Sequence, residues 1–299
     1  MIVFPNCKIN LGLNIVKKRK DGYHDLETVF YPLGLKDALE VIKDEGGKEQ
    51  GSKSKGRDTM PKKQEASENE SGTIKDVRFS KSGIGIDGKD EQNLCIKAYQ
   101  LLKKDFPDLP AVQIHLHKAI PTGAGLGGGS ADGAFTLQLL NQKFNLNIPA
   151  EKLIDYALQL GSDCPFFIIN KPCFATGRGE FLQKINLYLS AFSFLLVNPG
   201  IHISTTWAFS KLTPHPSAKP VKEVIEQPIE TWKAELINDF EPIVFDAYPE
   251  IRAIKETMYY AGAVYSSMTG SGSTVFGIFP KNRLPQLFGD KSYIVKEIM

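Results

Sequence analysis

The stretch that decides the fold reads PTGAGLGGGSADGA and runs from Pro121 to Ala134. Five of the seven residues at positions 123–129 are glycine, although glycine makes up only about 7% of an average protein. Glycine adopts positive φ angles and lets a ligand approach the backbone, and consecutive N–H groups in such a turn attract anions. Apolar residues at helical spacing follow, with Ser130 as the expected cap. The stretch therefore predicts a phosphate-binding loop at the start of a helix.

Three phosphate-binding motifs compete for this loop. A P-loop requires GxxxxGK followed by Ser or Thr, and no lysine follows the glycines before Lys143. Gly123, Gly125 and Gly128 fit the GxGxxG of a dinucleotide-binding fold, whose first strand should be apolar throughout. The preceding residues 112–118 instead alternate apolar and polar side chains, which indicates a strand with one solvated face. The dinucleotide-binding fold and an unliganded surface loop remain alternatives.

The third motif, PxxxGLGxxSA, is present at residues 121–131 and resembles the ATP-phosphate loop of the GHMP small-molecule kinases. Two more segments carry the same resemblance. KINL at residues 8–11, followed by DGYH at 21–24, resembles the start of one branch of these kinases. MTGSGS at residues 268–273 resembles the C-terminal glycine loop of the superfamily.

The resemblance spans almost the whole chain and implies an α+β fold of two domains. The N-terminal domain, residues 1–170, would bind ATP and have a fold like domain 2 of ribosomal protein S5. The C-terminal domain, residues 171–299, would be ferredoxin-like. The implied reaction is ATP-dependent phosphorylation of a cytidine diphosphate sugar alcohol in the non-mevalonate isoprenoid pathway. Another GHMP kinase, of the homoserine or mevalonate type, and a non-catalytic nucleotide-binding protein are the alternatives.

Two charged residues stand in apolar surroundings where packing alone does not explain them. Asp163 lies in a short turn between the end of an expected helix and an apolar run, where it either braces the turn before Pro165 or acts in catalysis. Lys8, between Cys7 and Ile9, either reaches the surface or points into a cleft. The resemblance implies that Asp163 is the catalytic base and that Lys8 lies beside it, keeping the carboxylate ionised.

The resemblance also implies the binding residues. Those expected to bind ATP are Pro121, Gly123, Ala124, Gly125, Leu126, Gly127, Gly128, Gly129, Ser130, Asn93 and Lys118. Those expected to bind the acceptor substrate are Asn10, Tyr23, His24, Thr205, Phe209, Gly270, Ser271 and Gly272, with Trp207 as an alternative aromatic. Stacking of the cytosine ring on Tyr23 and Phe209 would use the flat faces of these side chains.

The metal ligands are not determined by the sequence. ATP is expected to bind together with Mg²⁺. Relatives commonly show GGGSS at the start of the helix, whereas this chain has Ala131 in place of the second serine. Asp132 follows, and we expect it either to turn outward or to help hold Mg²⁺. His115 and His117 form an HxH pair, but no third ligand is evident and a solvated strand face explains them.

Composition limits the class of partner. The 299 residues carry a formal net charge of +2, which gives no reason to expect nucleic acid or an anionic membrane. The four cysteines lie far apart without metal-binding spacing and are expected to be reduced and packed. No leader pattern and no apolar run of about 20 residues is found. We therefore expect a cytoplasmic monomer or weak homodimer with a small-molecule substrate, and neither a nucleic-acid nor a membrane partner.

Residues 44–75 read as a disordered insertion, because 14 of these 32 residues are charged, seven of each sign, and few are apolar. Ordered structure should resume at Val77. Periodicity and turn residues predict the remaining elements. These are helices at 93–104, 150–160, 232–245 and 251–261, strands at 112–118, 166–169, 192–197 and 274–279, and a connector at 214–228.

Overall fold

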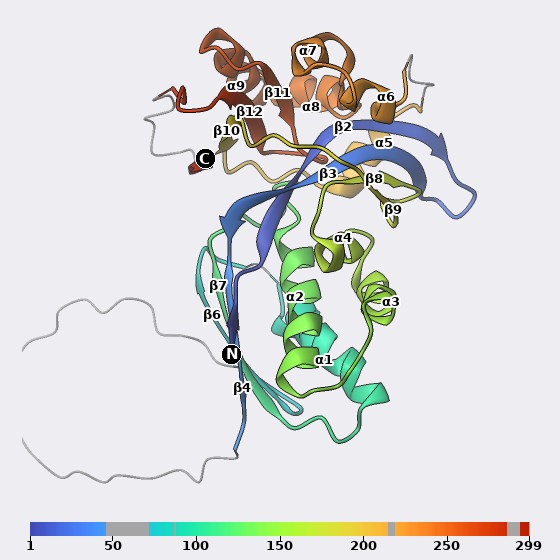
Figure 1. The fold of residues 1–299 in the computed structure, drawn as a ribbon, viewed down its shortest axis with the longest axis vertical. Helices are drawn as coiled ribbons and strands as arrows, with labels where there is room; N and C mark the ends of the chain where they lie inside the picture. The colour runs from blue at the N-terminus through green and yellow to red at the C-terminus, as the bar shows by residue number, and fades with distance from the viewer. Residues whose placement is uncertain (46–71, 87, 215–218, 286–293, 299) are drawn as a thin grey trace, which may run out of the picture.

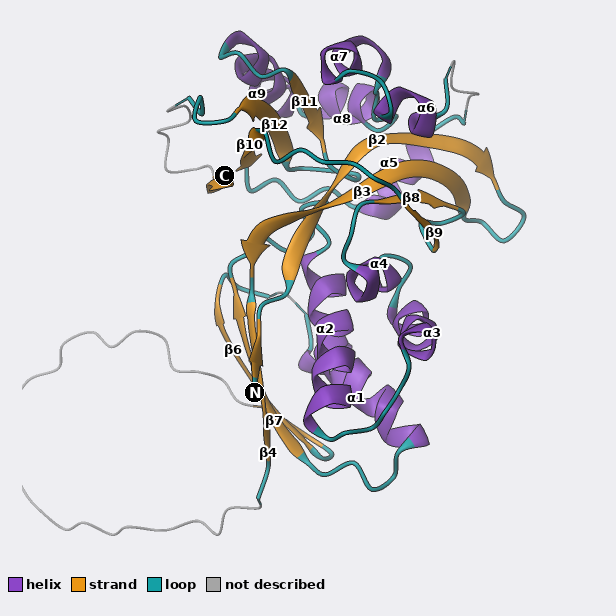
Figure 2. Ribbon diagram, in the orientation of Figure 1, coloured by secondary structure: helices purple, strands orange, loops and turns teal. Residues whose placement is uncertain are grey.

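A computed structural model describes residues 1–45, 72–86, 88–214, 219–285 and 294–298. Helices and strands are mixed along these residues and build three sheets with helices packed beside them (Figures 1 and 2). The mixed α and β content expected from the sequence is therefore confirmed. Most of the expected insertion, residues 46–71, lies outside the described residues.

The glycine stretch leads from a five-stranded sheet into the helical layer beside it. In spatial order, the strands are β1 (Ile2–Val3), β4 (Ala38–Lys43), β7 (Val112–Lys118), β6 (Val77–Gly83) and β5 (Gly72–Ile74). The helices are α1 (Leu94–Asp105), α2 (Gly128–Lys143), α3 (Ala150–Leu160) and α4 (Cys164–Ile169), with a 3₁₀ turn (Asp90–Gln92) before α1. Strand β7 pairs antiparallel with β4 and parallel with β6. This mixed sheet does not match the parallel sheet of a dinucleotide-binding fold.

A second sheet joins the two halves of the molecule. Its strands, in spatial order, are β2 (Asn6–Lys18), β3 (His24–Lys36), β8 (Cys173–Thr176) and β9 (Phe181–Lys184). Strands β2 and β3 form a long hairpin that extends from the half containing α2 to the half containing β10 (Figure 1). Strands from both sides of residue 170 thus share one sheet, and a domain boundary at that residue stays a prediction.

The third sheet and the remaining described helices form the other half. The strands are β11 (Tyr265–Met268), β12 (Val275–Pro280), β10 (Phe192–Asn198) and β13 (Ile294–Ile298). The helices are α5 (Thr205–Lys211), α6 (Val221–Ile225), α7 (Trp232–Glu235), α8 (Glu241–Ala247) and α9 (Pro249–Tyr260), with a 3₁₀ turn (Ile229–Thr231) before α7. Among the described residues, none of the helices is long and apolar enough to cross a membrane.

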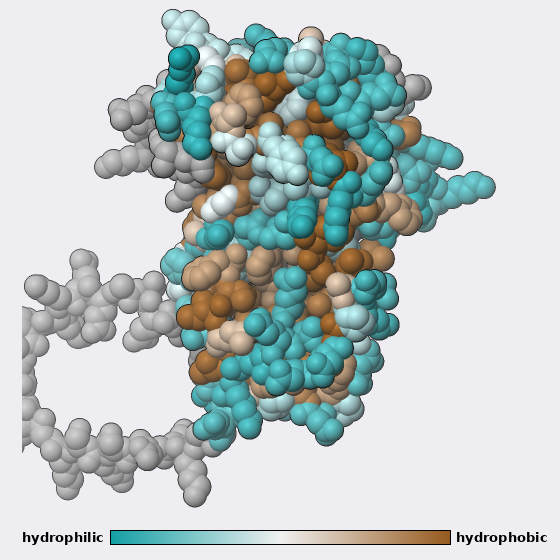
Figure 3. Space-filling model, viewed as in Figure 1, coloured by the Kyte–Doolittle hydropathy of each residue, from teal (hydrophilic) through white to brown (hydrophobic). Residues whose placement is uncertain are grey.

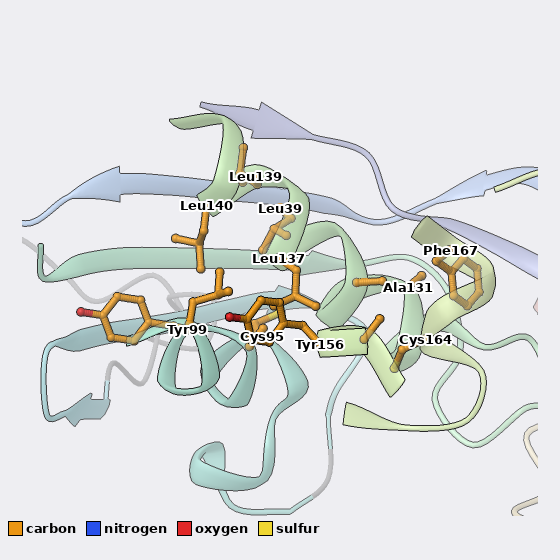
Figure 4. Packing of buried hydrophobic residues seen from close by; sticks show 14 of the residues in the cluster. Leu39, Cys95, Tyr99, Ala131, Leu137, Leu139, Leu140, Tyr156, Cys164 and Phe167 are labelled. Carbon is orange, nitrogen blue, oxygen red and sulfur yellow. The ribbon is translucent and has the colours of Figure 1, made fainter. Parts of the chain in front are cut away.

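Buried apolar side chains hold α1 and α2 against the five-stranded sheet. Figure 4 shows Leu137 and Leu140 of α2 close to Tyr99 and Cys95 of α1, all of them buried. Each large apolar side chain buried in this way contributes about 1.5–3 kcal/mol to stability. On the face drawn in Figure 3, hydrophilic residues cover most of the surface and hydrophobic ones form separate patches between them.

All four cysteines are free and buried, as expected. Burial raises the pKa of the Cys7 and Cys164 thiols to about 12 and that of Cys173 to about 11, and it also raises the pKa of Cys95. These thiols are therefore protonated at neutral pH, which makes them poor nucleophiles and poor metal ligands.

Several elements match the expected boundaries closely. The structure confirms the helices at 93–104 and 150–160 and the strands at 112–118 and 192–197 as α1, α3, β7 and β10. The side chain of Asn93 caps α1 by accepting a hydrogen bond from the Cys95 N–H at 2.9 Å. Gly161 follows the last turn of α3 as predicted. These elements could be predicted because their end signals and apolar spacing are local.

The expected strand at 166–169 is wrong, because these residues belong to helix α4. A short apolar run does not distinguish a buried strand from a buried helix. Pro165 stands in the first turn of α4, and Asn170 ends it in the left-handed conformation with φ 49°. The cap of α2 also differs from the prediction, since Ser130 lies inside the first turn and Gly127 occupies the cap position.

Three other boundaries need correction. The expected helix at 232–245 is two helices, α7 and α8, because the segment between them pairs with Leu13 of β2 through two backbone hydrogen bonds, Leu13 N–H to Ile237 O and Asp239 N–H to Leu13 O. The connector at 214–228 contains α6, although residues 215–218 lie outside the described residues. Ordered structure resumes before Val77, since residues 72–74 form β5 and pair with β6.

Candidate active site

The glycine loop lies between two cavities. Gly123, Gly125 and Gly127 line the first, which has a volume of about 640 Å³. Gly129 lines the second, which has a volume of about 270 Å³. Gly125 and Gly127 have φ angles of 76° and 71°, so both need glycine. A Cβ atom at Gly125 would lie 2.0 Å from the Thr269 carbonyl oxygen, which shows how closely the loop passes a second glycine turn.

Lys8 and Asp163 come together in the first cavity from opposite ends of the N-terminal half of the chain. The Lys8 Nζ atom lies 3.5 Å from Asp163 Oδ2 and 2.6 Å from Asn10 Oδ1. It also lies 4.7 Å from the centre of the Phe30 ring. The Lys8 side chain is 5% exposed, whereas that of Asp163 is 35% exposed. The ion pair is thus anchored on the lysine side and open to the cavity on the carboxylate side.

The position of Asp163 follows from the local chain. It precedes the first residue of α4, so its side chain emerges where the chain turns from α3 into α4. Lys8 is fixed by strand β2, and its backbone N–H donates to the Leu126 carbonyl of the glycine loop at 2.9 Å. Strand pairing and this contact together bring the ion pair to the glycine loop.

Most of the residues expected to bind the acceptor line the first cavity. These are Asn10, Tyr23, His24, Thr205, Phe209, Gly270 and Ser271. The Thr205 and Ser271 hydroxyls lie 3.2 Å apart, so the start of α5 contacts the C-terminal glycine turn. Gly272 is not among the lining residues and instead packs near Ile203 and Met268.

Aromatic rings gather at one end of the first cavity. The rings of His24 and Phe209 stack with centroids 4.9 Å apart and an interplanar angle of 25°. Phe209 also meets Phe240 edge-on. Burial, followed by the charge of Lys18, lowers the pKa of His24, so its ring is neutral at pH 7 and can offer both a donor and an acceptor. Trp207, the alternative aromatic, instead packs edge-on against Tyr248 and does not line the cavity.

Tyr23 is placed differently from His24. It is 56% exposed, and the guanidinium of Arg178 lies 4.9 Å from the centre of its ring. Arg178 also lines the cavity, and its backbone N–H donates to the Glu180 carboxylate. An exposed ring held by a cation is available for a flat ligand to stack on.

The second cavity is lined by residues expected on the ATP side. Asn93, Lys118 and Gly129 line it, together with Leu94 and Asp132. The expected ATP-binding residues that line neither cavity are Pro121, Ala124, Leu126, Gly128 and Ser130. Ala124 and Leu126 are core side chains, so only their backbone groups are available to a ligand.

Lys118 lies in a buried cluster of charges with Asp37 and Asp132, at the wall of the second cavity. Its Nζ atom contacts Asp37 Oδ2 and lies 2.8 Å from Asp132 Oδ2. Asp37 Oδ1 also accepts from the backbone N–H groups of Ala119 and Ile120. The expectation that Asp132 turns outward is therefore wrong, because it is buried against Lys118. Burial raises the pKa of Asp132 to about 7, although the charge of Lys118 opposes the shift.

The HxH pair is engaged with serine hydroxyls. The His115 ring lies 2.8 Å from Ser80 Oγ and 3.0 Å from Ser82 Oγ, and His117 lies 3.0 Å from the same Ser82 Oγ. Within the described parts of the chain, no group of three or more His, Cys, Asp or Glu side chains is arranged to hold a metal ion.

Sequence reasoning missed three residues that shape the site: Phe30, Asp37 and Arg178. Arg178 had a readable signal, because a charged residue between Gly177 and Gly179 marks a tight turn with an outward side chain. Phe30 and Asp37 had none, since their roles arise from contacts with residues distant in the sequence.

Comparison with known proteins agrees with this geometry. Residues 93–171 match the family model described as GHMP kinases N terminal domain, and residues 221–289 match the one described as GHMP kinases C terminal. The homoserine kinase from Cytophaga hutchinsonii has the same fold, with a TM-score of 0.67 at 12% sequence identity over 99% of this chain and 95% of that one. The fold and the site thus define a GHMP kinase.

Proteins with higher sequence identity to this chain show which branch of the GHMP kinases it belongs to. A 4-diphosphocytidyl-2-C-methyl-D-erythritol kinase from Bacteroides fragilis is 47% identical over 96% of this chain and 95% of its own length. One from Cytophaga hutchinsonii is 44% identical over 98% and 96%. A crystal structure of 4-(cytidine 5'-diphospho)-2C-methyl-D-erythritol kinase has a TM-score of 0.73 at 28% identity, covering 93% of this chain and 90% of that one. The chain belongs to the 4-diphosphocytidyl-2-C-methyl-D-erythritol kinase family of GHMP kinases.

Proposed function

We propose that this kinase transfers the γ-phosphoryl group of ATP to the 2-hydroxyl of 4-diphosphocytidyl-2-C-methyl-D-erythritol. One observation carries the proposal: a single glycine loop lies between a cavity with the Lys8–Asp163 pair and a cavity lined by Asn93 and Lys118. A nucleotide lying along the loop would have its base in the second cavity and its terminal phosphate in the first.

The glycine loop would hold the triphosphate through its backbone. Its N–H groups lead into the N-terminus of α2, where the helix dipole favours negative charge. Asn93 and Lys118, in the wall of the second cavity, would lie on the adenine side. The side chains of Ala124 and Leu126 pack in the core and keep the loop in one conformation, which limits the entropy lost when the nucleotide binds.

The aromatic end of the first cavity would bind the cytidine. Tyr23 and Phe209 present rings from the hairpin turn of β2 and β3 and from α5, and both line the cavity. His24 is neutral and would hydrogen bond to the pyrimidine edge. Arg178, also in the cavity wall, would face the diphosphate. Asn10, Thr205 and the Gly270–Ser271 turn would then contact the diphosphate and the sugar alcohol.

Lys8 and Asp163 would act on the acceptor hydroxyl between the two ligands. Asp163, with its exposed carboxylate, would orient the hydroxyl and accept its proton as the new O–P bond forms and the bond to ADP breaks. Lys8 would offset the negative charge of the phosphoryl group. Positioning of the hydroxyl should contribute more to the rate than proton abstraction.

Magnesium would accompany ATP. Mg²⁺ keeps several waters and binds substrate phosphates with one or two carboxylates. Asp163 is a carboxylate that lines the first cavity, and its oxygen-donor chemistry suits this ion. The metal would neutralise charge on the β- and γ-phosphates. We further propose that the kinase acts in the cytoplasm on this small molecule, as a monomer or weak homodimer without nucleic-acid or membrane partners.

An ADP-release assay tests the proposal directly. With ATP present, 4-diphosphocytidyl-2-C-methyl-D-erythritol should give rapid ADP release, while homoserine and mevalonate should give none above background. Asp163→Asn should lower kcat by about 10²–10⁴-fold and leave the ATP affinity near normal, because the substitution preserves shape. A higher rate with homoserine or mevalonate, or an unimpaired kcat in Asp163→Asn, would contradict the proposal.

A further inference from the structure

We propose that the hydroxyl of Thr269 is a positioning group that holds the phosphate loop in register with the side chains around the acceptor hydroxyl. Thr269 is fully buried and lines neither cavity, so it acts through its neighbours and does not touch a ligand. The inference rests on the proposed function, because it concerns how that site is kept in its reactive geometry.

The Thr269 hydroxyl meets both sides of the site at once. Its oxygen accepts a hydrogen bond from the Asn10 backbone N–H at 3.0 Å. Its single proton is within reach of two acceptors, the Gly125 carbonyl at 3.0 Å and Asn10 Oδ1 at 3.2 Å. One hydroxyl group therefore joins strand β2 to the glycine loop, although these segments lie far from Thr269 in the sequence.

Each of these partners is tied to the proposed chemistry. Asn10 Oδ1 also accepts from Lys8 Nζ at 2.6 Å, and Asn10 Nδ2 donates to Thr28 Oγ1 at 3.0 Å. These bonds fix the direction in which Lys8 points. Gly125 is one of the loop residues that line the acceptor cavity. A shift of Thr269 would therefore change the distance between the Lys8 ammonium and the bound phosphates.

Thr269 is itself held firmly, which a positioning group requires. Its N–H donates to the Thr274 carbonyl at 2.9 Å, and its carbonyl accepts from the Gly272 N–H at 3.1 Å. On either side, the Asn238 amide donates to the carbonyls of Met268 and Gly270 at 2.8 and 2.9 Å. The turn is thus rigid without the hydroxyl, and the hydroxyl provides its link to the catalytic side chains.

Removing this hydroxyl without changing the shape of the side chain isolates its role. Thr269→Val leaves the aromatic end of the cavity and the adenine side untouched, so the KM values for both substrates should stay within about threefold. Its kcat should fall by about 30- to 100-fold, because a misplacement of about 1 Å costs a reaction about this much. Thr269→Ser restores the hydroxyl and should recover kcat to within about threefold of the wild type.

Thr274→Val is the matched control. Thr274 is also fully buried at the end of the same turn, but its hydroxyl accepts from Asn198 Nδ2 at 3.0 Å and forms no hydrogen bond with Lys8, Asn10 or the phosphate loop, all of which are described. This variant should lose stability in a thermal melt while keeping kcat. If Thr269→Val does not fold, Thr269→Ala removes the same hydroxyl without added bulk, and circular dichroism shows which variant is folded.

Three results would overturn the inference: a folded Thr269→Val or Thr269→Ala with near wild-type kcat, a serine variant as impaired as the valine variant, or an equal loss of kcat in Thr274→Val. The rates are measured with whichever alcohol gives ADP release with the wild-type enzyme. Failure of the proposed substrate therefore appears in the wild type, whereas failure of this inference appears only in the variants.

Discussion

Two lysines of this chain are almost equally buried, yet their surroundings differ in one decisive respect. Lys8 and Lys118 are 4% and 2% exposed, and each lies on a strand, β2 and β7 respectively. Lys118 is held between two buried carboxylates, Asp37 and Asp132. Lys8 instead pairs with Asp163, whose carboxylate faces a cavity.

The two pairs thus differ in the exposure of the acidic partner and not in the burial of the lysine, and the proposed reactive pair is the one with the exposed carboxylate. Lys118 and Asp132 also line the second cavity, but their side chains are only 1% and 4% exposed, so little of this pair is open to a ligand. An ion pair with one open side can exchange water for a substrate hydroxyl. We therefore expect Lys8 to matter for rate and Lys118 to matter for stability, and single substitutions at the two positions test this division.

Replacing Lys8 should have the largest effect on the reaction. Lys8→Met should lower kcat by about 10²–10³-fold, because a preorganised donor near the transferred phosphoryl group is lost. The melting temperature should change little, since the exposed side of Asp163 can be hydrated. ADP release and a thermal melt measure the two effects. A loss of stability with unchanged kcat would remove the distinction between the two lysines.

Replacing Lys118 should have the largest effect on stability. Lys118→Met leaves the buried carboxylates of Asp37 and Asp132 without their cation, which should cost about 3–5 kcal/mol of unfolding free energy. Urea unfolding measures this loss. The double variant Lys118→Met with Asp132→Asn should recover part of it, because one of the two carboxyl groups that lost their cation is gone. If the stability losses of the two single variants simply add in the double variant, Lys118 and Asp132 do not interact as described.

Arg178 extends the comparison to a third cation, on the open side. Arg178→Ala removes the guanidinium from the Tyr23 ring and from the expected diphosphate position, so the KM for the cytidine substrate should rise about tenfold. The KM for ATP should not change. Inhibition by CDP, CMP and cytidine measures the contribution of the phosphates, and the advantage of CDP over cytidine should shrink in the variant. If CDP keeps its full advantage over cytidine in the variant, the diphosphate does not bind beside Arg178.

The smallest expected effect is a change in pH dependence. Burial raises the pKa of Asp132 from 3.8 to about 7 in the folded protein. Between these values the folded state binds more protons than the unfolded state, so the stability from this group is present at low pH and is lost as pH rises toward 7.

Asp132→Asn should remove this contribution. Thermal melts between pH 5 and pH 8 should show a pH dependence flatter than that of the wild type by about 2–4 °C. An identical slope in the wild type and the variant would mean that Asp132 does not hold the proton.

The parts of the site that could be predicted have local or short-range signals. The glycine run, the turn that carries Asp163 and the DGYH segment stand out in the sequence, and the resemblance to GHMP kinases related them to one another. The structure brings Lys8, Asp163 and Tyr23 to one cavity. Their catalytic and binding roles stay predictions until the variants are measured.

What could not be predicted depends on contacts between distant segments. The apolar run at 166–169 is compatible with a buried strand or a buried helix. Its packing in the helical layer makes it part of helix α4. Asp132 could be read as an outward or a metal-binding residue, and its direction was decided by Lys118 and Asp37. The glycine turn that contains Thr269 stands out in the sequence, but the partners of its hydroxyl do not, because Asn10 and Gly125 are 259 and 144 residues away.

The sequence by itself determined where the backbone can turn, cap and approach phosphate, since glycine conformations and apolar periodicity act over a few residues. Only the tertiary structure decided which of the two buried lysines has a partly exposed carboxylate as its partner. The packing of helices and sheets places each acidic partner. Because each carboxylate comes from a distant part of the chain, its exposure cannot be read from the residues near the lysine.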